Sequence, residues 1–182
     1  NVTVNPNFLV DSGIRNLKTV VLGEEISFPV MVAPVGGQQS VHSKAELASS
    51  KAANSAGTIY ILPASSAYGM KKIRKATKGP LWFQLYHHSN EMTEYLLPIA
   101  EDSGYSAICL TIDVPLPGPR DRDMRNNFTP YDQGSEWGSL AKRPDLIKRP
   151  EEIGIPDTTS WKPKPYGGLT WKRLEYFRSL TN

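Results

Sequence analysis

Four short apolar segments recur along the chain, and a helical pattern separates each from the next. The segments begin at Pro29, Thr58, Leu81 and Ala107, so that successive starts lie 29, 23 and 26 residues apart. This spacing is typical of a βα repeat, in which strands joined by crossover helices run parallel. The repeat therefore restricts the fold to two α/β architectures, a doubly wound open sheet or a (β/α)8 barrel.

Polar side chains gather at the carboxyl ends of two predicted strands, which favours the barrel. Gln84 and Tyr86 share one face of the segment Leu81–Tyr86, and Thr111 and Asp113 share one face at the end of the next. Parallel barrels carry their active sites at this end. No Gly-x-Gly-x-x-Gly or Walker-type motif is present, which disfavours a nucleotide-binding open sheet. We predict a TIM (β/α)8 barrel.

The length of the chain fits only part of such a barrel. A complete barrel has eight βα units and about 250 residues, whereas this chain has 182 residues and its repeat stops after four strands. We expect residues 1–182 to form the N-terminal half of a single barrel domain. The expected parts are an approach segment (1–28), βα units 1 to 4 (29–112), a long active-site loop with nine prolines (113–168) and a fourth helix (169–182).

Local patterns predict the helices. A capping box of Ser43 and Glu46 is expected to begin the first helix, and alanines at 45, 48, 52 and 56 give it a small-residue face. Helices are also expected over residues 68–76 and 90–103. Thr170 is expected to cap a last helix with Trp171, Leu174 and Phe177 facing inward. A small strand, residues 17–22, is expected outside the repeat.

Composition excludes several classes of function. A net charge of +3 without a concentrated basic face argues against nucleic-acid binding, and the basic cluster at residues 71–78 fits the solvated side of a helix. The longest apolar runs are too short to cross a bilayer, and we expect no metal site. The single cysteine, Cys109, favours a reducing compartment. The expected location is cytoplasmic, with peroxisomal or membrane-associated locations as alternatives.

Several motifs occur in a specific order between residues 8 and 128. They are Val21-Leu-Gly23, Val32-Ala-Pro34 with Gln38, Trp82-Phe-Gln-Leu-Tyr86, Leu110-Thr-Ile-Asp113, and Gly118-Pro-Arg120 followed by Arg122-Asp123 and Arg125-Asn126. In this order and spacing they closely resemble the FMN-dependent (S)-2-hydroxy acid dehydrogenases and oxidases. That family includes glycolate oxidase, lactate oxidase and flavin-type lactate dehydrogenases.

The resemblance implies an FMN site and a substrate site. Pro34, Val35 and Gly36 would lie along one flavin face, where a backbone N–H reaches the flavin N5. Gln84 and Thr111 would bind the pyrimidine edge of the ring. A less favoured alternative is that the two side chains lie in the barrel interior and satisfy one another. Trp82 better fits the core than a stacking partner of the cofactor.

On the substrate side, the resemblance assigns three residues. Tyr86 would contact the hydroxyl or carboxylate of the substrate, and Arg120 would bind the carboxylate with its two-pronged guanidinium. Asp113 would orient a catalytic histidine. In the family that histidine, and a lysine that stabilises reduced flavin, come from beyond residue 182. Neither His42 nor the pair His87 and His88 is expected to replace this base.

The chain also departs from the family pattern after the second predicted strand. Pro63 replaces a serine that contacts the flavin, and Ser65 stands at a position that is aromatic in some members. Because proline has neither a hydroxyl nor an N–H, it would not make the hydrogen bond to the flavin that the resemblance implies for this serine. This departure predicts a substrate pocket different from that of glycolate oxidase.

The resulting expectation is one half of an FMN-dependent enzyme that oxidises a small (S)-2-hydroxy acid to the 2-oxo acid, with oxygen, a quinone or a cytochrome as acceptor. Its expected partners are the substrate, the C-terminal half of the barrel on the same or a second chain, and further copies in a homo-oligomer. One alternative is a non-catalytic, self-associating half-barrel. Another is a related FMN barrel such as an isopentenyl diphosphate isomerase, which the carboxylate-binding pair Tyr86 and Arg120 argues against.

Overall fold

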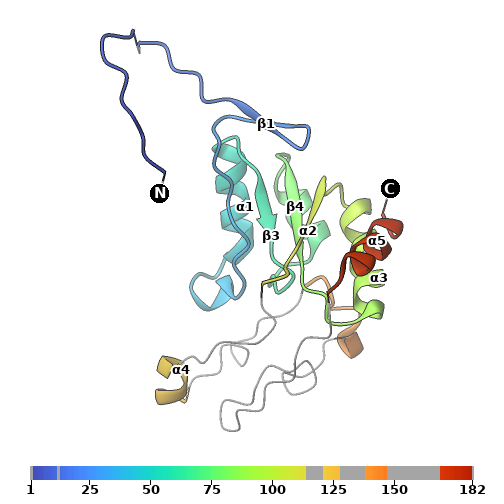
Figure 1. The fold of residues 1–182 in the computed structure, drawn as a ribbon. Helices are drawn as coiled ribbons and strands as arrows, with labels where there is room; N and C mark the ends of the chain where they lie inside the picture. Colours follow the sequence, from blue (N-terminus) through green and yellow to red (C-terminus); the bar gives the residue numbers. More distant parts are fainter. Residues whose placement is uncertain (1, 12, 114–120, 128–137, 147–168, 182) are drawn as a thin grey trace.

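A three-stranded parallel sheet forms the centre of the computed structural model, which describes residues 2–11, 13–113, 121–127, 138–146 and 169–181. The strand order is β3 (Tyr60–Leu62), β4 (Leu81–Leu85), β5 (Ala107–Leu110). Tyr60 pairs with Leu81, and Gln84 pairs with Cys109. Helix α2 (Met70–Ala76) connects β3 to β4, and α3 (Asn90–Asp102) connects β4 to β5 (Figure 1). The predicted βα repeat is confirmed for these three strands.

The first predicted strand, residues 29–33, is reduced to a single parallel bridge between Val32 and Tyr60. The Val32 N–H donates to the Ile59 carbonyl at 3.0 Å, and the Ile61 N–H donates to the Val32 carbonyl at 3.1 Å. Proline at 29 has no N–H for a ladder, and Val30 is 60% exposed. The segment lies beside β3, at the edge of the described sheet, and the full core strand predicted here is therefore wrong. Within the described residues the sheet does not close into a barrel.

A layer of helices covers one face of the sheet. Tyr60, Phe83 and Leu85 point into this layer, where each is fully buried. The ring of Phe83 meets the ring of Tyr105 edge-on, with centroids 6.4 Å apart. The helices contribute apolar side chains that pack against these strands, among them Ala53, Met70, Ile73, Met92, Leu96, Leu97, Ala100 and Phe177. This core accounts for the parallel arrangement, because parallel strands need cover from crossover helices.

An antiparallel hairpin packs against the opposite face of the sheet. Strands β1 (Thr19–Val21) and β2 (Glu24–Ile26) are joined by Leu22 and Gly23, which both have positive φ, 48° and 86°. Buried Ile26 joins Ile59, Ile61 and Trp82 in a second apolar cluster. The small strand expected outside the repeat is therefore confirmed, its partner β2 was not expected, and Trp82 is a core residue, 6% exposed.

Helix α1 (Ala45–Ser55) differs from its prediction. Lys44 is its N-cap and makes no side-chain cap hydrogen bond, so the Ser43–Glu46 capping box is wrong. Glu46 is instead fully buried, and its Oε2 accepts a hydrogen bond from the Ala67 N–H at 3.2 Å. The small-residue face is also shifted, because residues 45, 46, 50 and 53 are buried whereas residues 52 and 56 are exposed.

The remaining helices follow their predictions more closely. The side chain of Ser89 caps α3 by accepting from the Met92 N–H at 3.1 Å, and Thr170 caps α5 (Trp171–Ser179) by accepting from the Arg173 N–H. Phe177 faces inward as expected, but Trp171 is 84% exposed. The prediction for Trp171 is therefore wrong. Trp171 is the first residue of α5, and in the first turn its side chain lies in solvent instead of against the core.

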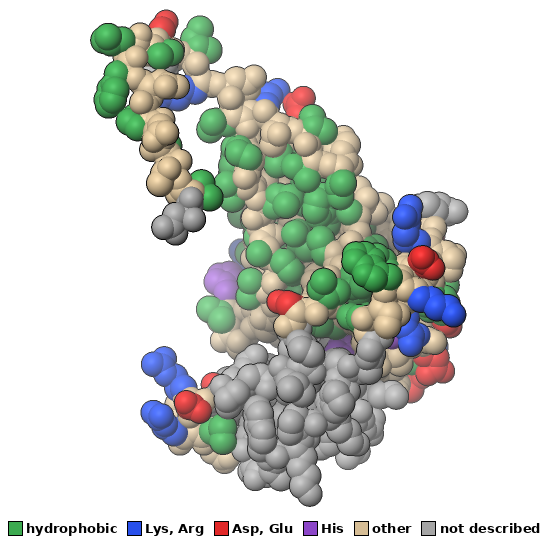
Figure 2. Space-filling model, in the orientation of Figure 1, with side chains coloured by type: hydrophobic (Ala, Val, Ile, Leu, Met, Phe, Trp, Pro, Cys, Tyr) green, Lys and Arg blue, Asp and Glu red, His purple; other side chains and the backbone are tan. Residues whose placement is uncertain are grey.

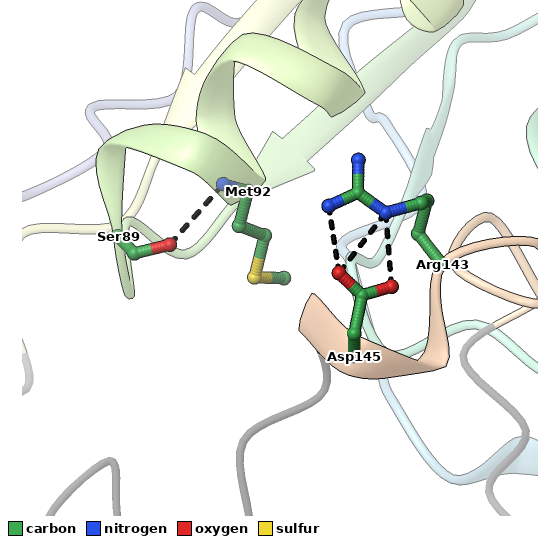
Figure 3. Close-up of polar contacts among 4 residues, drawn as sticks. All are labelled: Ser89, Met92, Arg143 and Asp145. Atoms are coloured by element: carbon green, nitrogen blue, oxygen red, sulfur yellow. Dashed lines mark hydrogen bonds and ion pairs between the residues drawn. The ribbon is translucent and has the colours of Figure 1, made fainter.

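Residues 138–146, within the long proline-rich stretch, pack against the helical layer. Leu140 is fully buried, and the Gly138 N–H donates to the Ser66 carbonyl at 2.9 Å. Arg143 pairs with Asp145 at 2.6 Å beside the first turn of α3 (Figure 3), and its guanidinium lies 5.6 Å from the centre of the Tyr95 ring. This segment also contains the 3₁₀ helix η2 (Pro144–Leu146), and the short α4 (Asp121–Arg125) lies in the part expected to be irregular.

None of the helices in the described ranges is long and apolar enough to cross a membrane.

Candidate functional site

The polar centre of the candidate site lies where β4 and β5 end. Gln84 is almost fully buried, at 4% exposure, near the end of β4. Its Nε2 donates to Thr111 Oγ1 at 2.8 Å, and its Oε1 accepts from the Ala64 N–H at 3.0 Å. The two side chains expected at the site are therefore brought together, in the mutual pairing that the sequence also allowed. Each side chain can make further hydrogen bonds. The Gln84 amide has a second N–H and a second lone pair, and the Thr111 hydroxyl has its own proton to donate.

Two neighbouring loops extend this centre. Ala64 and Ser65 follow β3, and Gly36 follows the bridge at Val32. A Cβ atom at Gly36 would overlap the Ser65 hydroxyl as it is placed here, so the two loops are in close contact at this glycine. Val35 is 57% exposed. A continuous edge thus runs from Gly36 through the Ala64–Ser65 loop to Gln84 and Thr111.

Gln38, in the 3₁₀ helix η1 (Gln38–Ser40), fixes the loop that contains Val35. Its Nε2 donates to the Val35 carbonyl at 2.9 Å and to the Tyr60 hydroxyl at 3.2 Å, and its Oε1 accepts from Ser49 Oγ at 2.6 Å. Gln38 is one of the residues in the family motifs, but no role was predicted for it from the sequence. The residue type was the one indication of this role, because an amide side chain has two N–H donors and an acceptor for such contacts.

The other predicted site residues lie at the ends of the strands or outside the described part of the chain. Half-buried Tyr86 follows β4 directly, and its ring stacks on His88 with centroids 5.8 Å apart. Asp113 is exposed and lies beyond β5. Pro34 is half-buried in the loop that precedes Gly36. Arg120, the predicted ligand of the substrate carboxylate, lies outside the described residues.

The two adjacent histidines are held mainly by packing. His87 Nδ1 lies 2.8 Å from Thr93 Oγ1 of α3, and its ring contacts Phe177 of α5 with centroids 4.8 Å apart. Burial, together with the nearby charge of Arg173, lowers the pKa of His87. Burial also lowers the pKa of His88 to about 4, with a further contribution from His87. Both rings are therefore neutral at pH 7.

The low pKa of His88 predicts that the protein loses stability in acid. An unfolded histidine titrates near pH 6.5, so between pH 6.5 and pH 4 the unfolded chain binds a proton that folded His88 does not. The free energy of unfolding should fall as the pH drops through this window, by about 3 kcal/mol in total. Urea unfolding at a series of pH values measures this loss.

The matched variants for this experiment are His88→Gln and His42→Gln. His42 is an exposed histidine, and its replacement is the control for removing one imidazole from the surface. His88→Gln should flatten the slope. If both variants keep the slope of the parent protein, the acid sensitivity arises elsewhere.

The described residues include no group of three or more histidine, cysteine, aspartate or glutamate side chains placed to hold a metal ion. Hydrogen-bonding groups along a strand-end edge, close to backbone without side chains, are instead suited to a planar polar cofactor. The polar edge from Gly36 to Thr111 therefore defines the candidate site.

Comparison with known proteins agrees with this type of site. The family model for FMN-dependent dehydrogenases matches residues 1–182. An L-lactate oxidase from Nostoc sp. is 35% identical over 187 residues, which cover 99% of this chain and 50% of the oxidase. Glycolate oxidase 3 from Oryza sativa subsp. indica is 38% identical over 128 residues, which cover 70% of this chain and 35% of that protein.

The fold agrees as well. A soluble mutant of the membrane-associated (S)-mandelate dehydrogenase from Pseudomonas putida superposes with a TM-score of 0.80 at 26% identity, over 98% of this chain and 49% of that one. The chain spans about half the length, or less, of the relatives that it matches. Because the family model covers every residue and the similarity extends to the structure, this chain belongs to the family of FMN-dependent dehydrogenases.

Proposed function

We propose that this chain supplies the N-terminal half of an FMN-dependent barrel enzyme that oxidises a small (S)-2-hydroxy acid to the corresponding 2-oxo acid. The observation that carries the proposal is the hydrogen bond between buried Gln84 and half-buried Thr111 beside the Gly36 loop, in a member of the FMN-dependent dehydrogenase family. The relatives named above are an L-lactate oxidase, a glycolate oxidase and an (S)-mandelate dehydrogenase. Lactate, glycolate and mandelate are all 2-hydroxy acids.

The residues of this edge fit an FMN ring. The pyrimidine part of the flavin presents alternating carbonyl and N–H groups, which need fixed donors and acceptors. Gln84 and Thr111 hold one another in place and keep a free N–H, a free lone pair and a hydroxyl proton for a ligand. The loop beside them consists of half-buried Pro34 and exposed Val35 and Gly36. Bound FMN supplies the acceptor for the two electrons removed from the substrate.

The substrate is held by the groups that follow β4 and β5 in this proposal. The Tyr86 hydroxyl contacts the hydroxyl or carboxylate of the acid, and the Arg120 guanidinium binds the carboxylate. Asp113 orients the histidine that accepts the proton of the substrate hydroxyl. The proposal assigns that histidine, and a lysine beside the flavin, to the C-terminal half.

An uncovered apolar surface supports the half-barrel arrangement. Exposed Val30, Val32, Val35 and Ile112 lie at or near the strands, and Figure 2 shows hydrophobic side chains spread over much of the face turned to the viewer. Open sheet edges and an exposed apolar surface, as found in the described part of the chain, are unusual for a complete domain. In the proposed enzyme the second half of the barrel covers both. Most of the expected active-site loop, residues 113–168, lies outside the described residues.

Arg120→Met is expected to raise KM for 2-hydroxy acids at least tenfold. The substitution keeps an unbranched side chain but removes a charge-assisted pair of hydrogen bonds, which contributes about 1.5 to 3 kcal/mol. The measurement is steady-state turnover with lactate and glycolate. Arg125→Met is the control, because Arg125 is an exposed residue of α4. Unchanged kinetics in Arg120→Met would remove Arg120 from the site.

The proposed function as a whole is tested by the polypeptide composition of the native sample together with its flavin absorbance. The intact mass of every polypeptide in the native sample is measured together with the absorbance of flavin near 450 nm, and (S)-lactate or glycolate is then added without oxygen. We expect a yellow sample that contains this sequence with a C-terminal half and bleaches with the acid. A colourless sample whose only species is 20.2 kDa would favour the self-associating, non-catalytic half-barrel.

A further inference from the structure

The side chain of Gln38 determines how one peptide bond of the candidate site is turned. Its amide donates to the Val35 carbonyl at 2.9 Å. That carbonyl and the N–H of Gly36 belong to the same planar peptide unit, in which the two groups point in opposite directions. Fixing the Val35 carbonyl toward Gln38 therefore fixes the Gly36 N–H away from Gln38.

The direction of this N–H follows from the partners of Gln38. Ser49 belongs to α1, and fully buried Tyr60 points into the helical layer. Gln38 thus holds the Val35 carbonyl from the side of α1 and the helices. The Gly36 N–H is turned to the other side, where the backbone of the loop is exposed and continues toward Ser65 and the Gln84 edge.

The three contacts of Gln38 also make its own position rigid. An amide that donates to two oxygens and accepts from a third cannot rotate without losing hydrogen bonds. Its anchors, Ser49 and Tyr60, belong to helix α1 and to strand β3 of the sheet. No other residue type of similar size offers these donors together with this acceptor.

We infer that Gln38 is a positioning residue that aims the Gly36 N–H at the N5 atom of FMN. This inference rests on the proposed function, because it requires FMN along the Pro34–Gly36 backbone. Gln38 does not touch the cofactor. It acts through the Val35–Gly36 peptide, so that its loss changes one specific hydrogen bond and leaves the rest of the site in place.

Comparison of FMN with 5-deaza-FMN tests this arrangement. The analogue carries C–H in place of N5 and accepts no hydrogen bond at this atom. One net hydrogen bond of about 1 kcal/mol corresponds to about fivefold in affinity, so the parent protein should bind FMN about five times more tightly than the analogue. Affinities are measured by flavin fluorescence after FMN has been removed from the native protein.

Gln38→Leu and Gln38→Glu should both reduce this preference to about one. Neither side chain donates to the Val35 carbonyl at neutral pH, and the glutamate keeps the length of the glutamine, so the two variants check each other if one folds poorly. Tyr60→Phe is the matched control. It removes one contact of Gln38 but leaves the bond to Val35, and it should keep the fivefold preference. A purely structural role of Gln38 would weaken the binding of both flavins equally.

The possible results separate the inference from the function on which it rests. A fivefold preference that disappears in both Gln38 variants supports the inference. A preference that the Gln38 variants keep, or a parent protein that binds both flavins equally, overturns the role of Gln38 while the FMN site stands. A parent protein that binds neither flavin overturns the proposed function and the inference together.

Discussion

Replacing Gln84 by leucine should weaken FMN binding by about 30-fold. The free N–H and lone pair of the Gln84 amide are the groups left for a flavin at the end of β4, once Thr111 and Ala64 have taken the others. Two lost hydrogen bonds of about 1 kcal/mol each correspond to about 30-fold in affinity. Leucine has nearly the same volume, so the packing around this buried position is preserved. Fluorescence titration with FMN measures the effect.

The same substitution also has a cost in stability that must be measured separately. Leucine leaves the Ala64 N–H without its side-chain acceptor, which destabilises the fold by about 1 to 3 kcal/mol. Thr111→Val is the companion variant, because it removes one hydroxyl from the pair and leaves the contact to Ala64 intact. Its FMN affinity should fall less, by about fivefold. If Gln84→Leu binds FMN as tightly as the parent, Gln84 serves only to join Ala64 and Thr111.

Phe83→Ala should destabilise the chain by about 4 kcal/mol, the largest loss expected from a single core substitution here. Phe83 is fully buried in the central strand of the parallel sheet and meets the Tyr105 ring. Truncation leaves a cavity between β4 and the helical layer, where strands on both sides limit any collapse. Urea unfolding, followed by far-ultraviolet circular dichroism, measures the loss.

Phe8→Ala is the matched control, since Phe8 is 81% exposed in the N-terminal segment that extends away from the sheet (Figure 1). It should change the free energy of unfolding by less than about 0.5 kcal/mol. A loss below about 1 kcal/mol for Phe83→Ala would mean that the core around β4 is more loosely packed than the burial of this ring indicates.

Much of the fold was accessible from pattern alone. The segments beginning at Thr58, Leu81 and Ala107 form β3, β4 and β5, because continuous apolar runs between helical patterns specify buried parallel strands. Sequence patterns predicted side-chain roles less reliably where one side chain can make either of two interactions. The spacing of Ser43 and Glu46 fits a cap, but a carboxylate that reaches the Ala67 N–H in the interior is not available for capping.

The candidate site was predicted in part. Alternation along β4 and β5 placed Gln84 and Thr111 at one end of the sheet, and the structure brings them within 2.8 Å. The role of Gln38 was not predictable from alternation, since its partners Ser49 and Tyr60 lie 11 and 22 residues away, on a helix and a strand. The roles of Tyr86, Asp113 and Arg120 remain predictions.

The sequence by itself determined the βα order, the faces of the strands and the family, because these depend on periodicity and on motifs that are local in the chain. Tertiary structure alone decided which polar groups satisfy one another. Glu46 binds Ala67, Gln84 binds both Ala64 and Thr111, and Gln38 binds Val35, Tyr60 and Ser49. A buried donor or acceptor takes whichever partner the packing of distant elements brings within reach, and no local pattern encodes that choice.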